Sequence, residues 1–222
     1  MKLRSSAIPL SSRALCRQRS QIVSDDAGNI VGLYERHAAA WDKARGKNLF
    51  ERAWLERFRT LVPAGGKILD LGCGAGEPIA RYFIEAGYRV TGADSSPSMI
   101  ARCKARFPDA AWIVADMRQI KLGEHFDGIL AWDSFFHLAH QDQAAMFPVF
   151  AEHAAPGAAL MFTSGTEHGV AMGNFEGEPL YHASLDPAEY RRLLAENGFS
   201  VVAQVFDDPA CGGHSVWLAR RG

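Results

Sequence analysis

The chain has 222 residues, of which 48% are apolar, and its 24 basic residues nearly balance 25 acidic ones. This length suits one well-cored domain with a modest extension, and the balanced charge lacks the basic face that proteins binding DNA or RNA carry. The cysteines form no C-x-x-C pair and no segment approaches 18 consecutive apolar residues, so neither a metal or disulfide framework nor a membrane-spanning helix is predicted.

Residues 1–23 differ in composition from the rest of the chain. They hold five basic residues and five serines but no acidic residue, and we interpret them as a disordered basic tail. A transit peptide and a misplaced start codon are the alternatives. We expect residues 24–65 to form a helical segment that covers the main domain, residues 66–222, with 24–222 folding as one globular unit.

A strand, a helix and a second strand follow in quick succession. KILDL (67–71) is a short apolar run, residues 77–87 have helical spacing, and residues 88–94 return to a strand pattern. Pro78 falls in the first turn of the helix and Gly87 just past its end, where these residue types are favoured. The pattern is that of a βαβ unit with parallel strands.

The alternation continues to the end of the chain. Further strands are predicted at 110–116, 126–132 and 158–165, and helices at 96–107, 143–154 and 186–198. The last two strands, 199–207 and 214–221, are joined by a connection too short to cross over a sheet, so they must be antiparallel. We therefore predict an α/β, Rossmann-like, doubly wound sheet of seven mostly parallel strands that ends in an antiparallel hairpin.

Several of these features together resemble the class I S-adenosylmethionine (SAM)-dependent methyltransferase family, of the type that acts on small molecules. They are the sequence ILDLGCGAGE (68–77), Asp94 ending the second strand, Asp116 and Met117 after the third, and the closing hairpin. The resemblance covers roughly residues 30 to 221. It implies SAM as cofactor, S-adenosylhomocysteine as product, no metal, and a small organic methyl acceptor.

The glycine loop also admits a dinucleotide-binding dehydrogenase as a competing interpretation. Gly72, Gly74 and Gly76 permit positive φ angles and close approach of a ligand to the backbone. Asp94, 18 residues after Gly76, fits the ribose-binding acid of either class. The position where the dinucleotide pattern has its third glycine is Glu77, and an acid at a helix N-terminus would repel a pyrophosphate. The spacing therefore favours SAM.

Acidic residues at the predicted strand ends point the same way, because SAM carries a sulfonium and an ammonium group but no phosphate. The four acids are Asp70, Glu77, Asp94 and Asp116. Each also has an ordinary role, such as a favourable charge in the first turn of a helix. Their joint placement predicts a site for a cationic ligand.

The resemblance assigns cofactor-binding roles by position. Asp94 would accept hydrogen bonds from the ribose hydroxyls, Asp116 and Met117 would meet the adenine, and the backbone carbonyl of Trp132 would meet the ammonium group. The full predicted cofactor set is Tyr34, Arg45, Asp70, Gly72, Cys73, Gly74, Gly76, Asp94, Ser95, Asp116, Met117 and Trp132.

The sequence YERHAAAWDKARG (34–46) resembles the N-terminal lid of many small-molecule methyltransferases. In such a lid, Tyr34 packs over the cofactor and Arg45 faces its carboxylate. The wider segment reads equally well as an amphipathic helical cover whose apolar face holds Trp41, Trp54, Leu55 and Phe58. Both interpretations can hold together.

Methyl transfer needs alignment of the acceptor and exclusion of water, and it needs a general base only when the acceptor is protonated. Residues 131–140 follow the fourth strand, where ligands bind in open α/β sheets. We predict His137 and Asp133 as the catalytic candidates, with packing or helix capping as the alternative.

Residues 165–185 are long, glycine-rich and predicted to be a functional loop. Its His168, Tyr181 and His182 are the predicted substrate residues. His214, which opens the last strand, is interpreted as an edge residue.

The loop after the fourth strand reads Trp-Asp-Ser-Phe (132–135), which lacks the Asn/Asp-Pro-Pro-Tyr/Phe signature of enzymes that methylate nucleic-acid amino groups or protein glutamine. We expect a cytoplasmic monomer or homodimer with a small-molecule acceptor and neither a nucleic-acid nor a membrane partner. Oxygen, nitrogen, sulfur and carbon acceptors stay open. The alternatives are an NAD(P)-dependent oxidoreductase of Rossmann type and a SAM-binding protein without catalysis.

Overall fold

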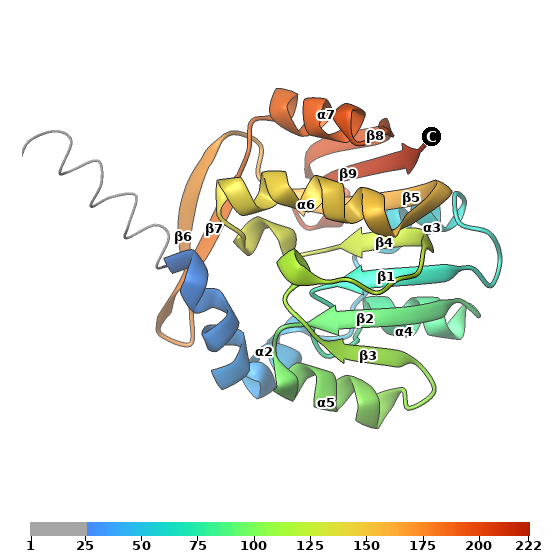
Figure 1. The fold of residues 1–222 in the computed structure, drawn as a ribbon. Helices are drawn as coiled ribbons and strands as arrows, with labels where there is room; N and C mark the ends of the chain where they lie inside the picture. Colours follow the sequence, from blue (N-terminus) through green and yellow to red (C-terminus); the bar gives the residue numbers. More distant parts are fainter. Residues whose placement is uncertain (1–25) are drawn as a thin grey trace, which may run out of the picture.

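A computed structural model describes residues 26–222, so the predicted basic tail lies outside the described residues. Seven strands form one sheet in the order β3-β2-β1-β4-β5-β9-β8 (Figure 1). Strands β1 to β5 pair in parallel, whereas β9 runs antiparallel to both β5 and β8. The predicted fold class is confirmed. The strands are β1 (Lys67–Leu71), β2 (Arg89–Asp94), β3 (Ala111–Val114), β4 (Phe126–Ala131), β5 (Ala154–Ser164), β8 (Phe199–Asp208) and β9 (His214–Arg221).

Helices follow the strands close to their predicted positions. Residues 26–36 are also helical, and short 3-10 turns lie at η1 (Met117–Gln119), η2 (Phe135–His137) and η3 (Pro209–Cys211). The helices are α2 (Ala38–Arg45), α3 (Arg52–Arg59), α4 (Ile79–Glu85), α5 (Pro97–Arg106), α6 (His140–His153) and α7 (Pro187–Glu196).

The start of α5 shows how local sequence sets these boundaries. Ser96 is the N-cap, its Oγ accepts a hydrogen bond from the N–H of Met99 at 3.1 Å, and Pro97 occupies the first turn. A serine cap satisfies one of the free N–H groups of the first turn, and proline there loses no hydrogen bond.

Alternation along the strands builds two apolar layers, one on each face of the sheet. Leu69 and Ile129 pack with α6 and α7, whereas their neighbours Ile68 and Leu130 pack with α3, α4 and α5. Successive residues of a strand point to opposite faces, so each strand serves both layers. The result is a three-layer arrangement in which the strand ends are left for the site.

Residues 165–185 form a β-hairpin, so the prediction of a loop there is wrong. Strand β6 (Gly169–Phe175) pairs with β7 (Glu178–Ser184) as a second, two-stranded sheet. The turn residues Glu176 and Gly177 both have positive φ, as the tight turns of two-residue hairpins require. In Figure 1 this hairpin stands beside the N-terminal helices, at the edge toward which β1 to β4 point.

The N-terminal segment divides between two tasks. Trp54, Leu55 and Phe58 of α3 are buried in the core against the sheet, whereas Trp41 of α2 packs on Tyr34 and on Phe175 of the hairpin. The apolar face expected from the sequence is therefore present, but α3 belongs to the core layer. The division of the chain at residue 65 stays a prediction.

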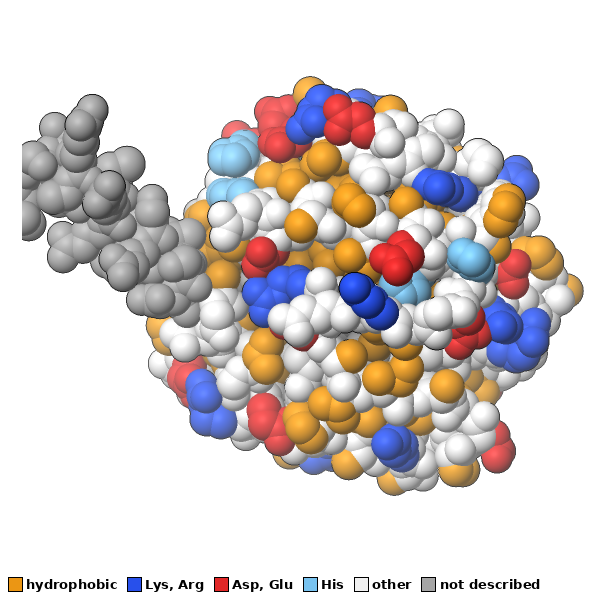
Figure 2. Space-filling model, in the orientation of Figure 1, with side chains coloured by type: hydrophobic (Ala, Val, Ile, Leu, Met, Phe, Trp, Pro, Cys, Tyr) orange, Lys and Arg blue, Asp and Glu red, His pale blue; other side chains and the backbone are white. Residues whose placement is uncertain are grey.

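The surface is mixed in charge. On the face shown in Figure 2, basic and acidic side chains alternate and no broad area of one sign appears. None of the helices in residues 26–222 combines the length and the apolar character needed to span a bilayer.

Candidate functional site

A cavity lies at the carboxyl ends of β1 and β4, the neighbouring strands from which the chain leaves toward opposite faces of the sheet. Such a switch point is where open α/β sheets bind ligands. The structure brings thirteen of the predicted site residues to this cavity: Tyr34, Arg45, Asp70, Gly72, Cys73, Gly74, Asp94, Ser95, Asp116, Met117, Trp132, Asp133 and His137.

The glycine loop adopts the backbone that the sequence predicted. Gly72, Gly74 and Gly76 have φ angles of 74°, 53° and 78°, in the left-handed region that favours glycine. A Cβ on Gly72 would lie 2.2 Å from the Cβ of Ser134, so the loops after β1 and β4 touch there. A Cβ on Gly74 would meet nothing closer than 3.8 Å.

Gly76 does not line the cavity, which corrects its assignment to the cofactor. A Cβ there would come within 3.3 Å of Cys103 Sγ and of the Trp112 ring, behind the loop. Its role in the structure is to let the loop pack closely against α5 and β3.

Asp94 is fixed at the end of β2 by two backbone hydrogen bonds. Its Oδ2 accepts from the N–H of Gly74 at 2.9 Å and its Oδ1 from the N–H of Ser96 at 2.8 Å. Burial raises its pKa despite those bonds. Burial, with the nearby Asp94 charge, raises the pKa of Asp70 to about 7. Two buried carboxylates therefore share this side of the cavity, with no basic side chain bonded to either within residues 26–222.

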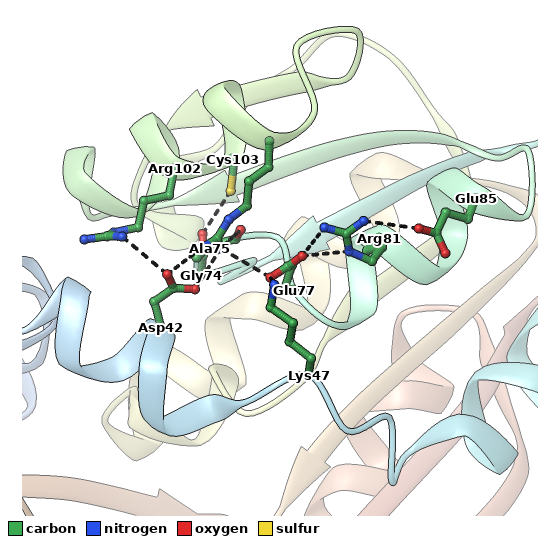
Figure 3. A network of polar contacts seen from close by, with 10 residues as sticks. Asp42, Lys47, Gly74, Ala75, Glu77, Arg81, Glu85, Arg102 and Cys103 are labelled. Atoms are coloured by element: carbon green, nitrogen blue, oxygen red, sulfur yellow. Dashed lines mark hydrogen bonds and ion pairs between the residues drawn. The ribbon is translucent and has the colours of Figure 1, made fainter.

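Glu77 and Asp116 differ from the sequence expectation because arginines already neutralise them. Glu77 pairs with Arg81, with Lys47 at 3.2 Å and with Arg106 at 3.7 Å, in the network of Figure 3. The pKa of Glu77 is lowered by these cations, although burial opposes them.

Asp116 binds Arg118 through both carboxylate oxygens, at 2.6 Å and 3.0 Å for the two shortest contacts. This hydrogen bonding lowers its pKa. Of the four predicted acids, Asp70 and Asp94 are therefore the two without a basic partner among the described residues, and Asp70 is only partly ionised at neutral pH.

Arg45 pairs with Glu51, whose side chain is fully buried. The Nη1 of Arg45 and the Nε1 of Trp132 are buried without a hydrogen-bond partner among the described residues, and both residues line the cavity. Buried polar atoms are almost always paired, so unpaired donors at a cavity indicate a ligand that accepts from them.

Tyr34, His137 and the backbone of Tyr181 form a chain of hydrogen bonds. The carbonyl of Tyr181 can only accept, so His137 donates from Nδ1 to it at 2.7 Å. The lone pair on its Nε2 then accepts a hydrogen bond from the Tyr34 hydroxyl at 2.8 Å. Burial lowers the pKa of His137 to about 4 and raises that of Tyr34 far above its usual value.

His137 is thus a neutral, fully bonded histidine at neutral pH, which makes it a poor general base. We expect its burial to make the protein less stable in acid. The pKa falls from 6.5 to about 4 on folding, so this contribution is complete above pH 6.5 and is lost as the pH falls toward 4. The loss amounts to about 3 kcal/mol over that window.

Urea unfolding at pH 7 and pH 4.5 measures this loss. A His137→Asn variant should show a smaller drop in unfolding free energy between the two pH values than the unaltered chain. His125→Asn, at an exposed position, is the control and should keep the full drop. If the drop in unfolding free energy is unchanged in His137→Asn, the loss of stability in acid comes from groups other than His137.

The predicted substrate residues do not line this cavity. Tyr181 is buried against Ile30 and acts through its carbonyl, while His168 is exposed and stacks on His140. His182 packs behind His137, with ring centres 4.8 Å apart. Their assignment to the substrate is corrected in this respect.

Three contributors were missed from the sequence. They are Ser134, whose Oγ donates to the Leu71 carbonyl at 2.7 Å, the buried Glu51, and His214, whose Nε2 lies 2.9 Å from Asp133 Oδ1. Residues 26–222 contain no group of three or more His, Cys, Asp or Glu side chains placed to hold a metal ion.

A seven-stranded sheet closed by an antiparallel hairpin, with a glycine loop and strand-end acids at the switch point, defines the Rossmann-like class of methyltransferases. Residues 68–157 match the family model described as "Methyltransferase domain". Over these residues the chain is similar to the class I SAM-dependent methyltransferases.

The curated relatives match only part of the chain, and at low sequence identity. The chain is 29% identical over 137 residues to dTDP-3-amino-3,4,6-trideoxy-alpha-D-glucopyranose N,N-dimethyltransferase of Streptomyces venezuelae, and the match spans 58% of this chain and 57% of that protein. The chain thus covers little more than half the length of such curated relatives.

Two solved structures show the same fold at low identity. The SAM-bound amino pentose methyltransferase CalS10 of Micromonospora echinaspora has a TM-score of 0.65 at 20% identity, covering 83% of this chain and 96% of that one. The 1,6-didemethyltoxoflavin-N1-methyltransferase of Burkholderia thailandensis has a TM-score of 0.66 at 18% identity, covering 97% and 93%.

Proposed function

We propose that this chain is a SAM-dependent methyltransferase that transfers a methyl group to a small organic molecule, with an amine nitrogen as the acceptor atom. The observation that carries the proposal is the cavity at the β1/β4 switch point, where neither Asp70 nor Asp94 has a basic partner, and Arg45 Nη1 no hydrogen-bond partner, among residues 26–222. A ligand with both cationic and carboxylate groups suits that set of side chains.

The cavity fits SAM in its charges. The carboxylate of SAM would be met by Arg45 and its ammonium by the Trp132 carbonyl and the carboxylates, while Asp94 would accept from the ribose hydroxyls. Asp116 and Met117 line the cavity where we place the adenine. Bound SAM supplies a methyl group already activated on a sulfonium.

The chain itself then has to align the acceptor and exclude water. The N-terminal helices line the cavity, and Glu178 of the hairpin β6–β7 pairs with Arg36 and His37 of this helical segment. Phe175 adds an aromatic contact to Trp41, with ring centres 5.5 Å apart. These contacts support a closed site in which the acceptor meets little solvent.

The choice of an amine rests on two supports. The curated relative described above is named as an N,N-dimethyltransferase of an amino sugar, and the solved relatives are named for an amino pentose and a ring nitrogen. Asp133 lines the cavity beside the neutral His137, so a carboxylate is present to receive a proton from an ammonium group.

A transfer assay tests the function directly. The full chain is incubated with SAM labelled on its methyl group and a panel of amino sugars, other amines and the matching alcohols and acids. We expect label to enter amines, with one S-adenosylhomocysteine formed for each methyl transferred. Tight binding of SAM with no transfer to any compound would instead favour a SAM-binding protein without catalysis.

Asp94 provides a binding test that needs no acceptor. We expect Asp94→Ala to weaken binding of S-adenosylhomocysteine by about 1–3 kcal/mol, because charge-assisted hydrogen bonds to the ribose are lost. Calorimetric titration measures the change.

The matched control is Asp127→Ala, since Asp127 also accepts a backbone N–H, that of Lys67 at 2.8 Å, but lies at the opposite end of the sheet. Its affinity for S-adenosylhomocysteine should stay as in the unaltered chain. Equal weakening in both variants would mean that general destabilisation, rather than a ribose contact, is being measured.

A further inference from the structure

His214 stands in the middle of a stack of side chains at one end of the cavity. The guanidinium of Arg45 lies 5.1 Å from the centre of the Phe50 ring, the Phe50 and His214 rings are 5.3 Å apart, and His214 stacks on Trp132 at 5.6 Å with 25° between the planes. Arg45 and Trp132 line the cavity. The His214 imidazole is therefore held between two aromatic faces.

The hydrogen bonding of His214 fixes where its protons are. Its Nδ1 lies 2.7 Å from the carbonyl oxygen of Cys211, so Nδ1 carries a proton and donates it. Its Nε2 lies 2.9 Å from Asp133 Oδ1, at ion-pair distance but without the alignment of a hydrogen bond. Without a proton on either atom, a nitrogen lone pair would face a carboxylate lone pair at that distance. One proton must therefore belong to the contact between His214 and Asp133.

The surroundings place that proton on the imidazole. The carboxylate of Asp133 and the Cys211 carbonyl raise the pKa of His214, the buried Glu51 adds to the effect, and only burial opposes them. Aromatic faces on both sides also favour a cation. Arg45, the nearest permanent cation of the stack, is neutralised by Glu51 and lies beyond the Phe50 ring.

Asp133 is held in an unusual conformation by the same contacts. Its φ angle is 48°, in a region that residues other than glycine rarely adopt, and its N–H donates to Thr163 Oγ1 at 3.0 Å. The ion pair with His214 takes Oδ1. Oδ2 makes no hydrogen bond or ion pair to residues 26–222, and the residue lines the cavity.

We propose that His214 is a positioning residue that acts through Asp133, holding this carboxylate directed into the cavity so that it takes the proton of an ammonium acceptor. In that step an N–H bond of the acceptor breaks, an O–H bond forms on Asp133, and the nitrogen keeps the electron pair with which it attacks. The proton later passes to water. This positioning role rests on the proposed function. The ion pair between His214 and Asp133 does not depend on that function.

NMR titration of the full chain without any acceptor tests the ion pair. The Asp133 carboxyl carbon and the His214 ring nitrogens are followed in the unaltered chain, His214→Gln, His214→Leu and Asp133→Asn. We expect the Asp133 carboxyl carbon of the unaltered chain to shift as His214 titrates, and this inflection to be absent from His214→Leu and His214→Gln.

Asp133→Asn should lower the pKa of His214, because the neighbouring carboxylate that raises it is removed. The signal of His153, a histidine that also donates from Nδ1 to a carbonyl but lies at the end of α6, is the reference and should not move. An Asp133 carboxyl signal that does not respond to the titration of His214, or a His214 pKa that is unchanged in Asp133→Asn, would overturn the pair.

The catalytic role is tested separately with an amine acceptor found in the transfer assay. In the unaltered chain kcat/KM should decline as the pH rises through the pKa measured for His214, because the ion pair is lost. In His214→Leu this limb should be absent, and His214→Gln should restore part of the rate. A merely structural role would lower the rate equally at all pH values. If the ion pair titrates as expected but no acceptor is methylated, the proposed function fails and the ion pair stands.

Discussion

An Arg45→Met variant is expected to lose about 3–5 kcal/mol of unfolding free energy, because it leaves the fully buried carboxylate of Glu51 without its cation. Removing one partner of a buried ion pair costs far more than the pair contributes, since the remaining charge cannot be hydrated. Urea unfolding at neutral pH measures the loss.

Two further variants separate this effect from other consequences of losing Arg45. Arg45→Met with Glu51→Leu should recover most of the loss, because no unpaired charge is left. Arg36→Met breaks the exposed pair with Glu178 and should change the unfolding free energy far less than Arg45→Met does. A double variant as unstable as Arg45→Met alone would mean that the arginine stabilises through contacts other than Glu51.

Gly72→Ala is expected to destabilise the protein more than Gly74→Ala, although both residues have left-handed φ angles. Each substitution carries the backbone cost of about 1–2 kcal/mol for a side chain in this region. A Cβ on Gly72 would also lie 2.2 Å from Ser134 Cβ, so the loops must separate, at a further cost of about 1–3 kcal/mol. Thermal or urea unfolding of the two variants gives the difference directly.

The same displacement should reach the site, because Ser134 follows Asp133 in the chain. We expect Gly72→Ala to weaken binding of S-adenosylhomocysteine, and a second substitution, Ser134→Gly, to restore part of both stability and binding by removing the contacted atom. If Gly72→Ala and Gly74→Ala are equally stable, the two loops have more freedom than their contact implies.

The number of strands in the main sheet and their directions could be predicted because they depend on local patterns. Short apolar runs alternate with helical spacing, and the connection between β8 and β9 is too short for a crossover. The hairpin β6–β7 was missed because its strands contain glycine and exposed residues in place of a clear apolar alternation. Its one local signal is the pair Glu176-Gly177, which forms the turn.

The cavity residues could be predicted for a similar reason. Parallel strands deliver their carboxyl ends to one edge of the sheet, so Asp70, Asp94 and Asp133 had to lie near one another. Whether an acidic residue is neutralised depends on its neighbours. For Glu77 and Asp116 a neutralising arginine lies close in the sequence. Arg81 follows Glu77 by four residues on a helix and Arg118 follows Asp116 by two, and both pair as that spacing allows.

Contacts between distant segments could not be found in this way. Glu51, Phe50 and His214 come from segments some 160 residues apart, and their meeting depends on the register in which β9 lies against β5. That register pairs Ser164 with Ser215, which sets His214 beside the end of β4. The predicted antiparallel hairpin already puts β9 in the sheet. The sequence contains no pattern, however, that specifies the register of β9 against β5.

The central claim is that the cavity at the β1/β4 switch point binds SAM and not a dinucleotide. Calorimetric titration of the full chain with S-adenosylhomocysteine and, separately, with NADH and NADPH tests it most directly. We predict one S-adenosylhomocysteine bound per chain, weakened by Asp94→Ala, and no binding of either nicotinamide nucleotide. Binding of NADH or NADPH in preference to S-adenosylhomocysteine would contradict the account.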